Sequence, residues 1–473
     1  MEAIKSELEL QVKRIKSKLI LARKADKKFK IFGANGHKYK ISKPISTDLV
    51  AAVERKYGFQ LPACYKTFIT QIGNGGKANG HAAGPFHGIY SLQKSINEVD
   101  GFNGPDGPQR ACIIYPYISE DDWQKQTYTI ENNDLNDEEY DNELARLYGG
   151  ILLIGSQGCA FVTGLVLNGE HKGKIVNLSF DRALPKFTFE DSFLDWYERW
   201  LDEVISGDLL EWENGWFGYT VSGSEKQLLE KYFMSECEGY KCRCLESLLM
   251  KSRTISTETL HILENQYHLN EGDLKRICLE IMVKFNYLQT KTYLHEYFDI
   301  EPEFVIELLY LYGKGKIEEW IEILYAFVPS IKDSSIFGYF VNILKNNKIN
   351  NYQIILPFTK YEDNGMRLIA FSALTSLDNK TKQTLINYFI AGLTDSNVDV
   401  IYHVLSALKG IVDNRLLKYY QEIARKISEK EEYQSLTYRL NDCLTDFNLT
   451  NETILNIDAE NYKIRKWFQF WKK

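Results

Sequence analysis

Three short patterns in this sequence combine residue types that proteins use for phosphate binding, metal binding or nucleophilic catalysis. Asn74-Gly75-Gly76-Lys77 suggests a phosphate-binding loop, which needs G-x-x-x-x-G-K-[ST] at the start of a helix so that backbone N–H groups hold the phosphate. No hydroxyl residue follows Lys77, and further glycines continue the loop where a helix should begin. The glycines therefore fit left-handed turns and close backbone approach better than nucleotide binding.

The clustered cysteines do not meet the spacing rules of a metal site. Cys237, Cys242 and Cys244 are the closest set of thiols in the chain. Structural zinc favours four ligands from paired, short-spaced elements. This cluster offers three thiols, and the nearby His261 and His268 are separated by six residues. The sequence favours ordinary cysteines on a helix, and we predict no metal and no cofactor.

No residue group indicates acid–base or nucleophilic catalysis. Gly155-Ser156-Gln157-Gly158 lacks the G-x-S-x-G spacing that exposes a serine nucleophile on a strained turn. None of the eight histidines stands in a recognisable pairing with Cys, Ser or a carboxylate. His81 and His87 lie near the glycine-rich loop and are interpreted as surface contacts or pH-sensitive residues. We predict a protein that is not an enzyme; turnover that depends on either histidine would contradict this.

An acidic segment, Ser119–Glu143, holds ten Asp and Glu residues against Lys125 alone, a net charge of −9. One interpretation is a solvated, partly mobile insertion between strands. The other is a surface that attracts a basic partner, with Trp123, Tyr128 and Tyr140 as aromatic anchors, because complementary charge selects partners and aromatic residues dominate interface energies. The candidate partner contacts are Trp123, Asp134, Asp137, Glu138, Glu139, Tyr140 and Asp141, together with Asn74, His81 and His87 of the glycine-rich loop.

Glycine and proline divide the chain into two parts. Residues 1–223 contain 23 of the 31 glycines and 7 of the 10 prolines. Because these residues mark turns and strand ends, the first part is predicted to be mixed α/β and the second nearly all helical. The polar stretch 219–224 is the predicted linker. We predict three regions: a basic helix at 1–28, an α+β domain at 29–218 and a helical domain at 224–473.

The elements of the α+β domain follow from hydrophobic periodicity and capping residues. Helices are predicted over Ser46–Tyr57, from Pro62 onward and over 190–205, where apolar residues recur at helical spacing. Short apolar runs predict strands at Ile113–Tyr117, Ile151–Gly155, Phe161–Leu167 and Lys174–Leu178.

Residues 2–28 form a predicted amphipathic helix with an apolar stripe and a strongly basic remainder. Its stripe includes Leu8, Val12, Ile15 and Leu19. Such a helix can lie on an anionic membrane surface. It can equally dock on its own protein with a solvated outer face, and we favour this second interpretation.

The second half of the chain predicts a series of helices. Residues 365–377 and 395–412 carry apolar faces and are offset by roughly 30–35 residues, a spacing that resembles HEAT-type repeats. Asp395 or Ser396 is the predicted cap of the second helix. Between Leu228 and Leu356 the helical periodicity persists without a clean repeat.

Composition excludes several function classes. A formal net charge of −7 and a pI near 5.8 argue against a general nucleic-acid binder. The chain starts without an apolar signal segment and contains no run of about eighteen apolar residues, so neither secretion nor a membrane span is expected. The eight scattered cysteines fit reduced thiols, and we predict a cytoplasmic protein.

Two separated blocks of sequence together resemble one known family. The first runs from Glu54 to Tyr90, with a helix ending at Leu61-Pro62, a second apolar helix and the glycine-rich turn. The second runs from Gly158 through the helix 187–204. Their order resembles the SUKH superfamily (the Smi/Knr-type domain) over about residues 29–218. The matching positions are Glu54, Leu61, Pro62, Tyr65, Phe68, Asn74, Gly75, Gly76, Gly84, Pro85, Gly88, Gly158, Trp196 and Trp200.

The resemblance implies an α+β SUKH domain followed by an all-α, HEAT-like solenoid. It also implies protein binding without catalysis, since bacterial SUKH domains are commonly immunity proteins that neutralise a toxin by direct binding. Many such toxins are nucleases or deaminases with basic clefts, so a basic nuclease-type toxin is the expected partner. The alternative is a regulatory scaffold that bridges two client proteins. The long acidic segment and the helical second half depart from the usual single-domain pattern.

Overall fold

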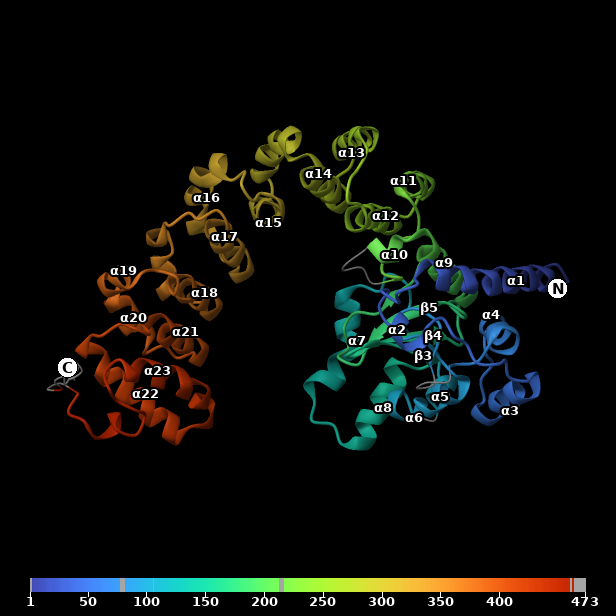
Figure 1. Cartoon of the computed structure of the whole chain (residues 1–473), viewed down its shortest axis with the longest axis horizontal. Helices are drawn as coiled ribbons and strands as arrows, with labels where there is room; N and C mark the ends of the chain where they lie inside the picture. The colour runs from blue at the N-terminus through green and yellow to red at the C-terminus, as the bar shows by residue number, and fades with distance from the viewer. Residues whose placement is uncertain (1, 77–80, 105, 212–216, 460–461, 463–473) are drawn as a thin grey trace, which may run out of the picture. The chain divides into compact units, whose positions relative to one another are not determined.

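The computed structural model describes residues 2–76, 81–104, 106–211, 217–459 and 462 (Figure 1). Lys77, the final residue of the phosphate-loop pattern, therefore lies outside the described residues. The chain divides into two compact units, Met1–Ile281 and Met282–Lys473. An α+β region with a six-stranded sheet is followed by a helical region, which confirms the predicted fold class.

The sheet of the first unit is antiparallel throughout, in sequence order. Its strands are β1 (His81–Ala82), β2 (Ile89–Tyr90), β3 (Ile151–Gly158), β4 (Phe161–Val166), β5 (Ile175–Ser179) and β6 (Lys186–Phe187). β3, β4 and β5 form its long centre and agree with three predicted strands. A short turn at residues 159–160 joins β3 to β4, as antiparallel pairing permits, whereas residues 91–150, which include the acidic segment, lie between β2 and β3.

Helices of the first unit cover both faces of the sheet. Their bounds are α1 (Glu2–Ala25), α2 (Ala34–His37), α3 (Thr47–Tyr57), α4 (Ala63–Thr67), η1 (Phe68–Ile72), α5 (Leu92–Asn97), α6 (Val99–Phe102), η2 (Gly107–Gln109), α7 (Glu120–Asn132), α8 (Asp137–Leu147), α9 (Phe193–Ser206), α10 (Asp208–Glu211), α11 (Glu225–Met234), α12 (Glu238–Lys251) and α13 (Thr257–Leu269).

Side chains alternate between the two faces of β3, as strand geometry requires. Leu152 and Ile154 join the core formed with α9, whereas Ile151 and Leu153 join a second core that includes Trp123 of α7. α9 is the principal cover of the first face, because Phe193, Trp196, Tyr197, Trp200 and Leu201 are all buried. Both faces of the sheet are therefore buried, and the acidic segment packs on the second of them through α7.

Several family positions have visible structural functions. Glu54 of α3 accepts hydrogen bonds from the Leu61 backbone N–H (3.0 Å) and from Lys66 Nζ (2.8 Å), which fixes the entry to α4. Tyr65 and Phe68 are buried against Phe193 of α9, with ring centroids 5.0 Å apart in each pair. These residues maintain the domain, as the resemblance implied.

The predicted strand at Ile113–Tyr117 is wrong, because this segment has no regular secondary structure. Pro116 has no N–H to donate to a neighbouring strand, and Tyr117 has a positive φ of 62°, which is outside the strand region. The hydrophobic character of Ile113 and Ile114 reflects packing on the α7 side of the sheet.

α1 docks on α9. Val12, Ile15 and Ala22 are buried in the core of the first unit. Arg14 Nε and Lys18 Nζ reach Glu198 Oε1 of α9 at 2.8 and 2.9 Å, and Gln11 donates to Asp195 at 2.8 Å. The inner face of α1 is thus docked on its own protein, which agrees with the interpretation favoured for this helix.

α11, α12 and α13 belong to the first compact unit. The Val221 backbone N–H donates to Ser247 Oγ of α12 (2.7 Å), and Lys251 of the same helix reaches Glu203 of α9 (3.4 Å). The end of this unit at Ile281 thus lies beyond the linker predicted at 219–224.

The second unit consists of helices. α14 (Gly272–Phe298) enters it with a kink at Asn286. The following elements are α15 (Pro302–Tyr312), η3 (Glu318–Trp320), α16 (Ile321–Phe327), η4 (Val328–Ser330), α17 (Ser334–Asn346), η5 (Tyr352–Ile354), η6 (Leu356–Lys360), α18 (Asn364–Leu374), α19 (Asn379–Thr384), α20 (Ile386–Gly392), α21 (Val398–Leu408), η7 (Asn414–Leu416), α22 (Leu417–Glu429), η8 (Glu431–Leu436), α23 (Thr437–Thr445) and η9 (Ile454–Asn456).

The two helices used to predict a repeat, now α18 and α21, pack on one another in this unit. Arg367 of α18 binds both carboxylate oxygens of Asp395, at 2.8 and 2.9 Å. Asn397, and neither Asp395 nor Ser396, caps α21. None of the helices in the described part of the chain is long and apolar enough to cross a membrane.

Candidate partner-binding surface

The acidic segment forms a helical hairpin, α7 followed by α8, so it is not an irregular insertion. Ser119 caps α7 through the Asp122 N–H, at 3.1 Å. Asn136 and Glu139 form a capping box on α8, with reciprocal hydrogen bonds of 3.0 Å. Acidic residues in the first turns also interact favourably with the helix dipoles. Part of the negative charge therefore stabilises the hairpin itself.

The hairpin is anchored by its apolar face. Trp123 and Ile130 of α7 and Leu147 of α8 are buried in the core on one side of the sheet. Trp123 Nε1 donates to the Arg182 backbone oxygen at 2.7 Å. Arg146 of α8 donates to the side-chain and backbone oxygens of Gln126 in α7, which joins the two helices.

Trp123 is therefore a correction to the predicted contact set. Its side chain is 3% exposed, because the indole fills the space between α7 and the sheet. A partner cannot reach it without unfolding the hairpin. The exposed aromatic residues of the hairpin are Tyr128 (62%) and Tyr140 (40%), and Tyr140 stays in the set.

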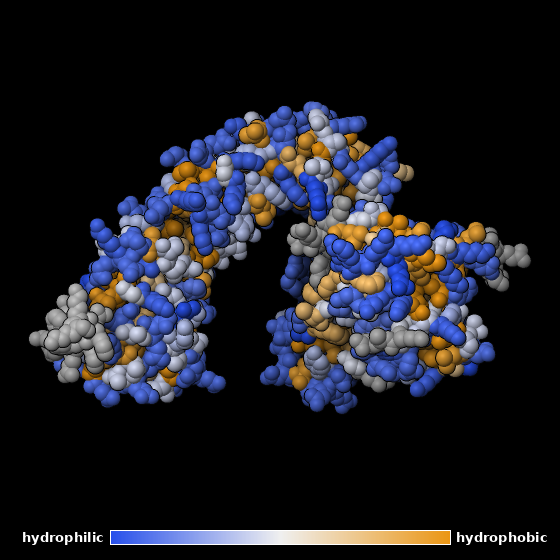
Figure 2. Space-filling view, viewed as in Figure 1, coloured by the Kyte–Doolittle hydropathy of each residue, from blue (hydrophilic) through white to orange (hydrophobic). Residues whose placement is uncertain are grey.

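The outer face of the hairpin carries carboxylates that the domain leaves unpaired. Three acidic residues form ion pairs, Asp122 with Lys125, Glu131 with Arg182 and Glu143 with Arg146. Among the described residues, six exposed carboxylates of the hairpin form no ion pair: Glu120, Asp121, Asp134, Asp137, Glu138 and Asp141. The region around the α7–α8 turn is mainly hydrophilic in Figure 2. Four predicted contacts, Asp134, Asp137, Glu138 and Asp141, lie in this group, and Glu139 is committed to the capping box.

The glycine-rich loop brings the other three predicted residues together. Asn74 Oδ1 accepts from the Leu92 N–H at 2.7 Å and so ties the loop to α5. His81 Nδ1 donates to the His87 backbone oxygen at 2.9 Å, and burial lowers the pKa of His81 despite this hydrogen bond. At Gly76 a Cβ would lie 1.5 Å from the His81 carbonyl, so only glycine fits. Asn74 and His81 thus hold the loop together.

His87 is the member of this trio that faces a surface of aromatic residues. Its ring lies 5.0 Å from that of Phe32, which is 57% exposed. The β3–β4 turn is adjacent, since a Cβ at Gly158 would lie 3.3 Å from His87 Nε2. Phe161 (36% exposed) and Phe180 (44% exposed) continue from this turn.

We define the exposed residues Phe32, Phe161 and Phe180 as the aromatic strip, because each of them lies beside the β3–β4 turn. The Phe180 N–H donates to Ala160 of the β3–β4 turn, and its ring lies 6.0 Å from Phe102. Two residues further on, Arg182 pairs with Glu131 of α7 at 3.4 Å. Exposed aromatic residues beside unpaired charges are typical of protein interfaces. Sequence reasoning missed the strip, because its members are far apart in the chain.

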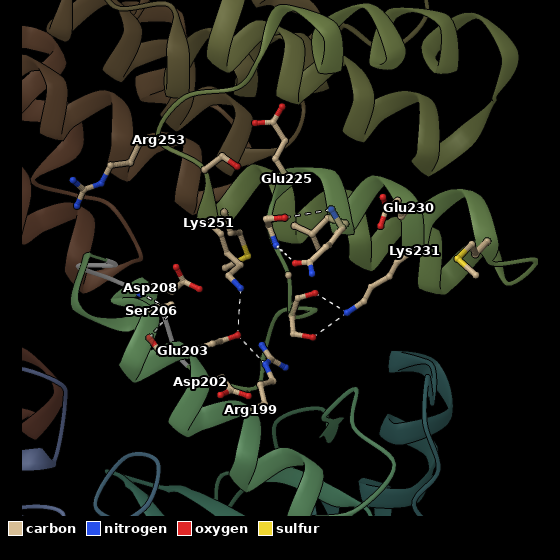
Figure 3. A pocket seen from close by; sticks show the side chains of 18 residues that line it. Arg199, Asp202, Glu203, Ser206, Asp208, Glu225, Glu230, Lys231, Lys251 and Arg253 are labelled. Atoms are coloured by element: carbon tan, nitrogen blue, oxygen red, sulfur yellow. Dashed lines mark hydrogen bonds and ion pairs between the residues drawn. The ribbon is translucent and has the colours of Figure 1, made fainter. Parts of the chain in front are cut away.

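A polar cleft of about 1410 Å³ between α9, α11 and α12 is a second candidate site (Figure 3). Arg199 of α9 contacts Glu190 (2.7 Å), Glu203 (2.8 Å) and the Thr220 carbonyl (2.7 Å). Burial alone would lower the pKa of Arg199, but the two carboxylates more than offset this and raise it. Lys231 of α11 donates to both oxygens of Ser222. Arg199 and Lys231 are thus held by groups of the protein itself, and the cleft joins helices, although Glu190 Oε2 and Glu203 Oε2 are buried without a hydrogen-bond partner.

The cysteine cluster of α12 shows no sign of metal binding within the described residues. No group of three or more His, Cys, Asp and Glu side chains there is arranged to hold a metal ion. Burial raises the pKa of Cys242 and of Cys244 to about 11, so both thiols are protonated at neutral pH.

The region that contains the sheet matches a known protein family. Residues 44–199 match the model of the SMI1 / KNR4 family (SUKH-1). No curated protein and no solved structure gives a significant match to the chain. The matched segment includes the hairpin, the glycine-rich loop and the first half of α9. The predicted SUKH resemblance is confirmed for this segment.

Proposed function

We propose that this chain is a cytoplasmic immunity-type protein that binds a basic toxin through the α7–α8 hairpin of its SUKH-1 domain and so blocks the toxin's active surface. The observation that carries the proposal is the set of six unpaired carboxylates on a hairpin whose other face is buried in the domain core. The family match supports a protein-binding function.

The hairpin is preorganised for binding. Its two capped helices, the Trp123 anchor and the Arg146 cross-link hold the outer carboxylates in place before any partner arrives. A rigid surface loses less conformational entropy on association than a mobile acidic loop would. The helical structure therefore favours a dedicated contact surface over the solvated-insertion interpretation.

The chemistry of this surface favours a cationic protein. Carboxylates repel the phosphates of nucleic acids. The described residues contain no acidic group arranged for a metal ion. Tyr128 and Tyr140 add exposed aromatic area of the kind that proteins use in interfaces.

The mechanism that follows is steering and occlusion. Unpaired carboxylates attract a basic cleft at long range and raise the association rate. In contact, they occupy the positions where a nuclease or deaminase toxin would hold the phosphates of its substrate. The tyrosines and the aromatic strip then exclude water around the charged centre.

The experiment measures the affinity of the full-length chain for the toxin candidate encoded next to it. The test variant carries Asp134→Asn, Asp137→Asn, Glu138→Gln and Asp141→Asn. The matched control neutralises four exposed carboxylates elsewhere in the first unit, with Glu170→Gln, Glu236→Gln, Glu258→Gln and Glu271→Gln. We expect roughly 100-fold weaker binding for the test variant, because each lost charge pair contributes about 0.5–1 kcal/mol. The control should bind like wild type.

Equal losses in both variants would assign binding to net charge and contradict a hairpin contact. Wild-type affinity in the test variant would also contradict a hairpin contact and would show that the toxin binds another surface. The alternative function, a scaffold for two client proteins, predicts that the full chain recovers two different proteins and that the hairpin variant releases at most one of them.

A further inference from the structure

The outward face of α1 is a second charged surface, opposite in sign to the hairpin. Its inner face is fixed on α9, so the helix presents one constant side to solvent. Residues 7–28 contain eight Lys and Arg side chains against three acidic residues, of which Glu7 and Glu9 are exposed at the N-terminal end and Asp26 is buried. Arg14 and Lys18 are paired with Glu198. The other six form no ion pair within the described residues: Lys13, Lys16, Arg23, Lys24, Lys27 and Lys28.

Aliphatic side chains are exposed on this same face. Leu10 is 54%, Ile20 61% and Leu21 48% exposed. With Lys13 and Lys24 they follow helical spacing, at i, i+3, i+10, i+11 and i+14, so they share the side of α1 that points away from α9. Hydrophobic and hydrophilic residues adjoin along the visible side of this helix in Figure 2.

We propose that the outward face of α1 binds the surface of anionic lipid membranes. Such binding combines two weak contributions: aliphatic side chains enter the headgroup boundary, and lysines interact with anionic headgroups. Lys13 and Lys24 lie on this face, and Lys27 and Lys28 follow the end of α1 at Ala25, in line with headgroup attraction. The helix needs no rearrangement, since its cationic and aliphatic groups are already exposed.

Lipid is favoured over nucleic acid as the occupant of this face. Single-stranded nucleic acids are held by aromatic side chains that stack on bases, and the outward face of α1 has exposed aliphatic residues instead. Arg, the residue best suited to bidentate phosphate contacts, contributes only Arg23 to the unpaired cations. The interaction would hold the SUKH-1 domain at the membrane while the hairpin stays available.

The experiment measures partitioning of the full-length chain onto phosphatidylcholine vesicles with about 30% phosphatidylserine and onto pure phosphatidylcholine vesicles. We expect binding to the anionic vesicles alone, weakened by salt. Lys13→Gln with Lys24→Gln should weaken it about 30-fold, because each lysine near such a surface contributes about 1 kcal/mol, or about fivefold in affinity. Ile20→Ser with Leu21→Ser should weaken it about tenfold.

Lys314→Gln with Lys380→Gln is the matched control, since it removes the same charge from exposed lysines of the second unit and should leave partitioning unchanged. Thermal unfolding verifies that each variant is folded. Absence of binding to the anionic vesicles, or an equal loss in the control, would overturn the proposal. Wild-type vesicle binding by Ile20→Ser with Leu21→Ser, combined with full competition by a polynucleotide, would assign the face to nucleic acid instead.

Discussion

The basic helix α1 and the acidic hairpin α7–α8 are two charged segments of the same domain, and they are attached to it in different ways. α1 is held by apolar residues and by ion pairs, because Arg14 and Lys18 meet Glu198 of α9. The hairpin is held mainly by Trp123 and its apolar neighbours, and the domain leaves most of its carboxylates unpaired. Charge that is paired inside the domain is structural, whereas unpaired charge on a fixed helix is available to a partner.

The largest expected effect tests the hairpin anchor. Trp123→Ala should lower the free energy of unfolding of the first unit by about 3–5 kcal/mol, because it leaves a cavity in the core and removes the hydrogen bond to Arg182. Tyr128→Ala, on the exposed face of the same helix, should change it by about 0.5 kcal/mol or less. Denaturant unfolding followed by tryptophan fluorescence or circular dichroism measures both. Similar losses in the two variants would contradict the assignment of inner and outer faces.

The α1 anchor is expected to be weaker. Glu198→Gln removes the carboxylate that accepts from Arg14, Lys18 and Gln11, and should cost about 1–2 kcal/mol. Asp191→Asn is the matched control, since the Asp191 side chain is 93% exposed and pairs with the exposed end of Lys174 at 3.2 Å. Hydrogen exchange should show faster opening of α1 in Glu198→Gln and unchanged protection of α7. Unchanged α1 protection would show that its apolar face alone holds it.

Low pH should weaken the ion-pair attachment of α1 before it weakens the apolar attachment of the α7–α8 hairpin, so the two can be compared in the wild-type protein. Burial opposes ionisation of Glu198, but hydrogen bonds from Arg14, Lys18 and Gln11 more than offset it and lower its pKa from 4.5 to about 2. A depressed carboxyl pKa contributes stability that is complete above about pH 4.5 and is lost as the pH falls towards 2. Hydrogen exchange over this window should show earlier loss of protection in α1 than in α7. The reverse order, or the same order in Glu198→Gln, would contradict the ion-pair anchor.

The smallest expected effect concerns the unpaired carboxylates. Asp134→Asn with Asp141→Asn should change the free energy of unfolding by about 0.5 kcal/mol or less, because both residues are exposed and form no ion pair within the described residues. Added salt should narrow any difference from wild type. Thermal unfolding at low and high salt measures this. A loss above about 2 kcal/mol would show that the carboxylates are structural.

The long elements of this fold were predicted from the sequence, but the folding of the acidic segment into two helices was not. The helices α3 and α9 were predictable because their apolar residues recur at helical spacing and a serine caps each one. The strands β3, β4 and β5 were predictable because each is a short apolar run. The helices α7 and α8 were also readable, since Trp123, Thr127 and Ile130 recur at helical spacing and Asn136 precedes Glu139 by three residues. Because the segment is so acidic, it was interpreted as an exposed surface, and Trp123 was therefore predicted to be a partner contact although it is buried.

The rest of the candidate surface could not be predicted, because it depends on tertiary proximity. Phe32 and His87 come from two separate segments, and their rings lie 5.0 Å apart only in the folded domain. The outward face of α1 was ambiguous for a related reason. Composition shows that the helix is basic and amphipathic. Only the folded domain shows which of its cations pair with Glu198 and which stay exposed without an ion pair.

The most direct test of the central claim is growth rescue by co-expression with the neighbouring toxin candidate. Wild type and the control Glu170→Gln, Glu236→Gln, Glu258→Gln, Glu271→Gln should protect cells. The hairpin variant Asp134→Asn, Asp137→Asn, Glu138→Gln, Asp141→Asn, expressed at the same level and equally stable, should not. Full protection by the hairpin variant, or no protection by wild type, would contradict neutralisation through the α7–α8 hairpin.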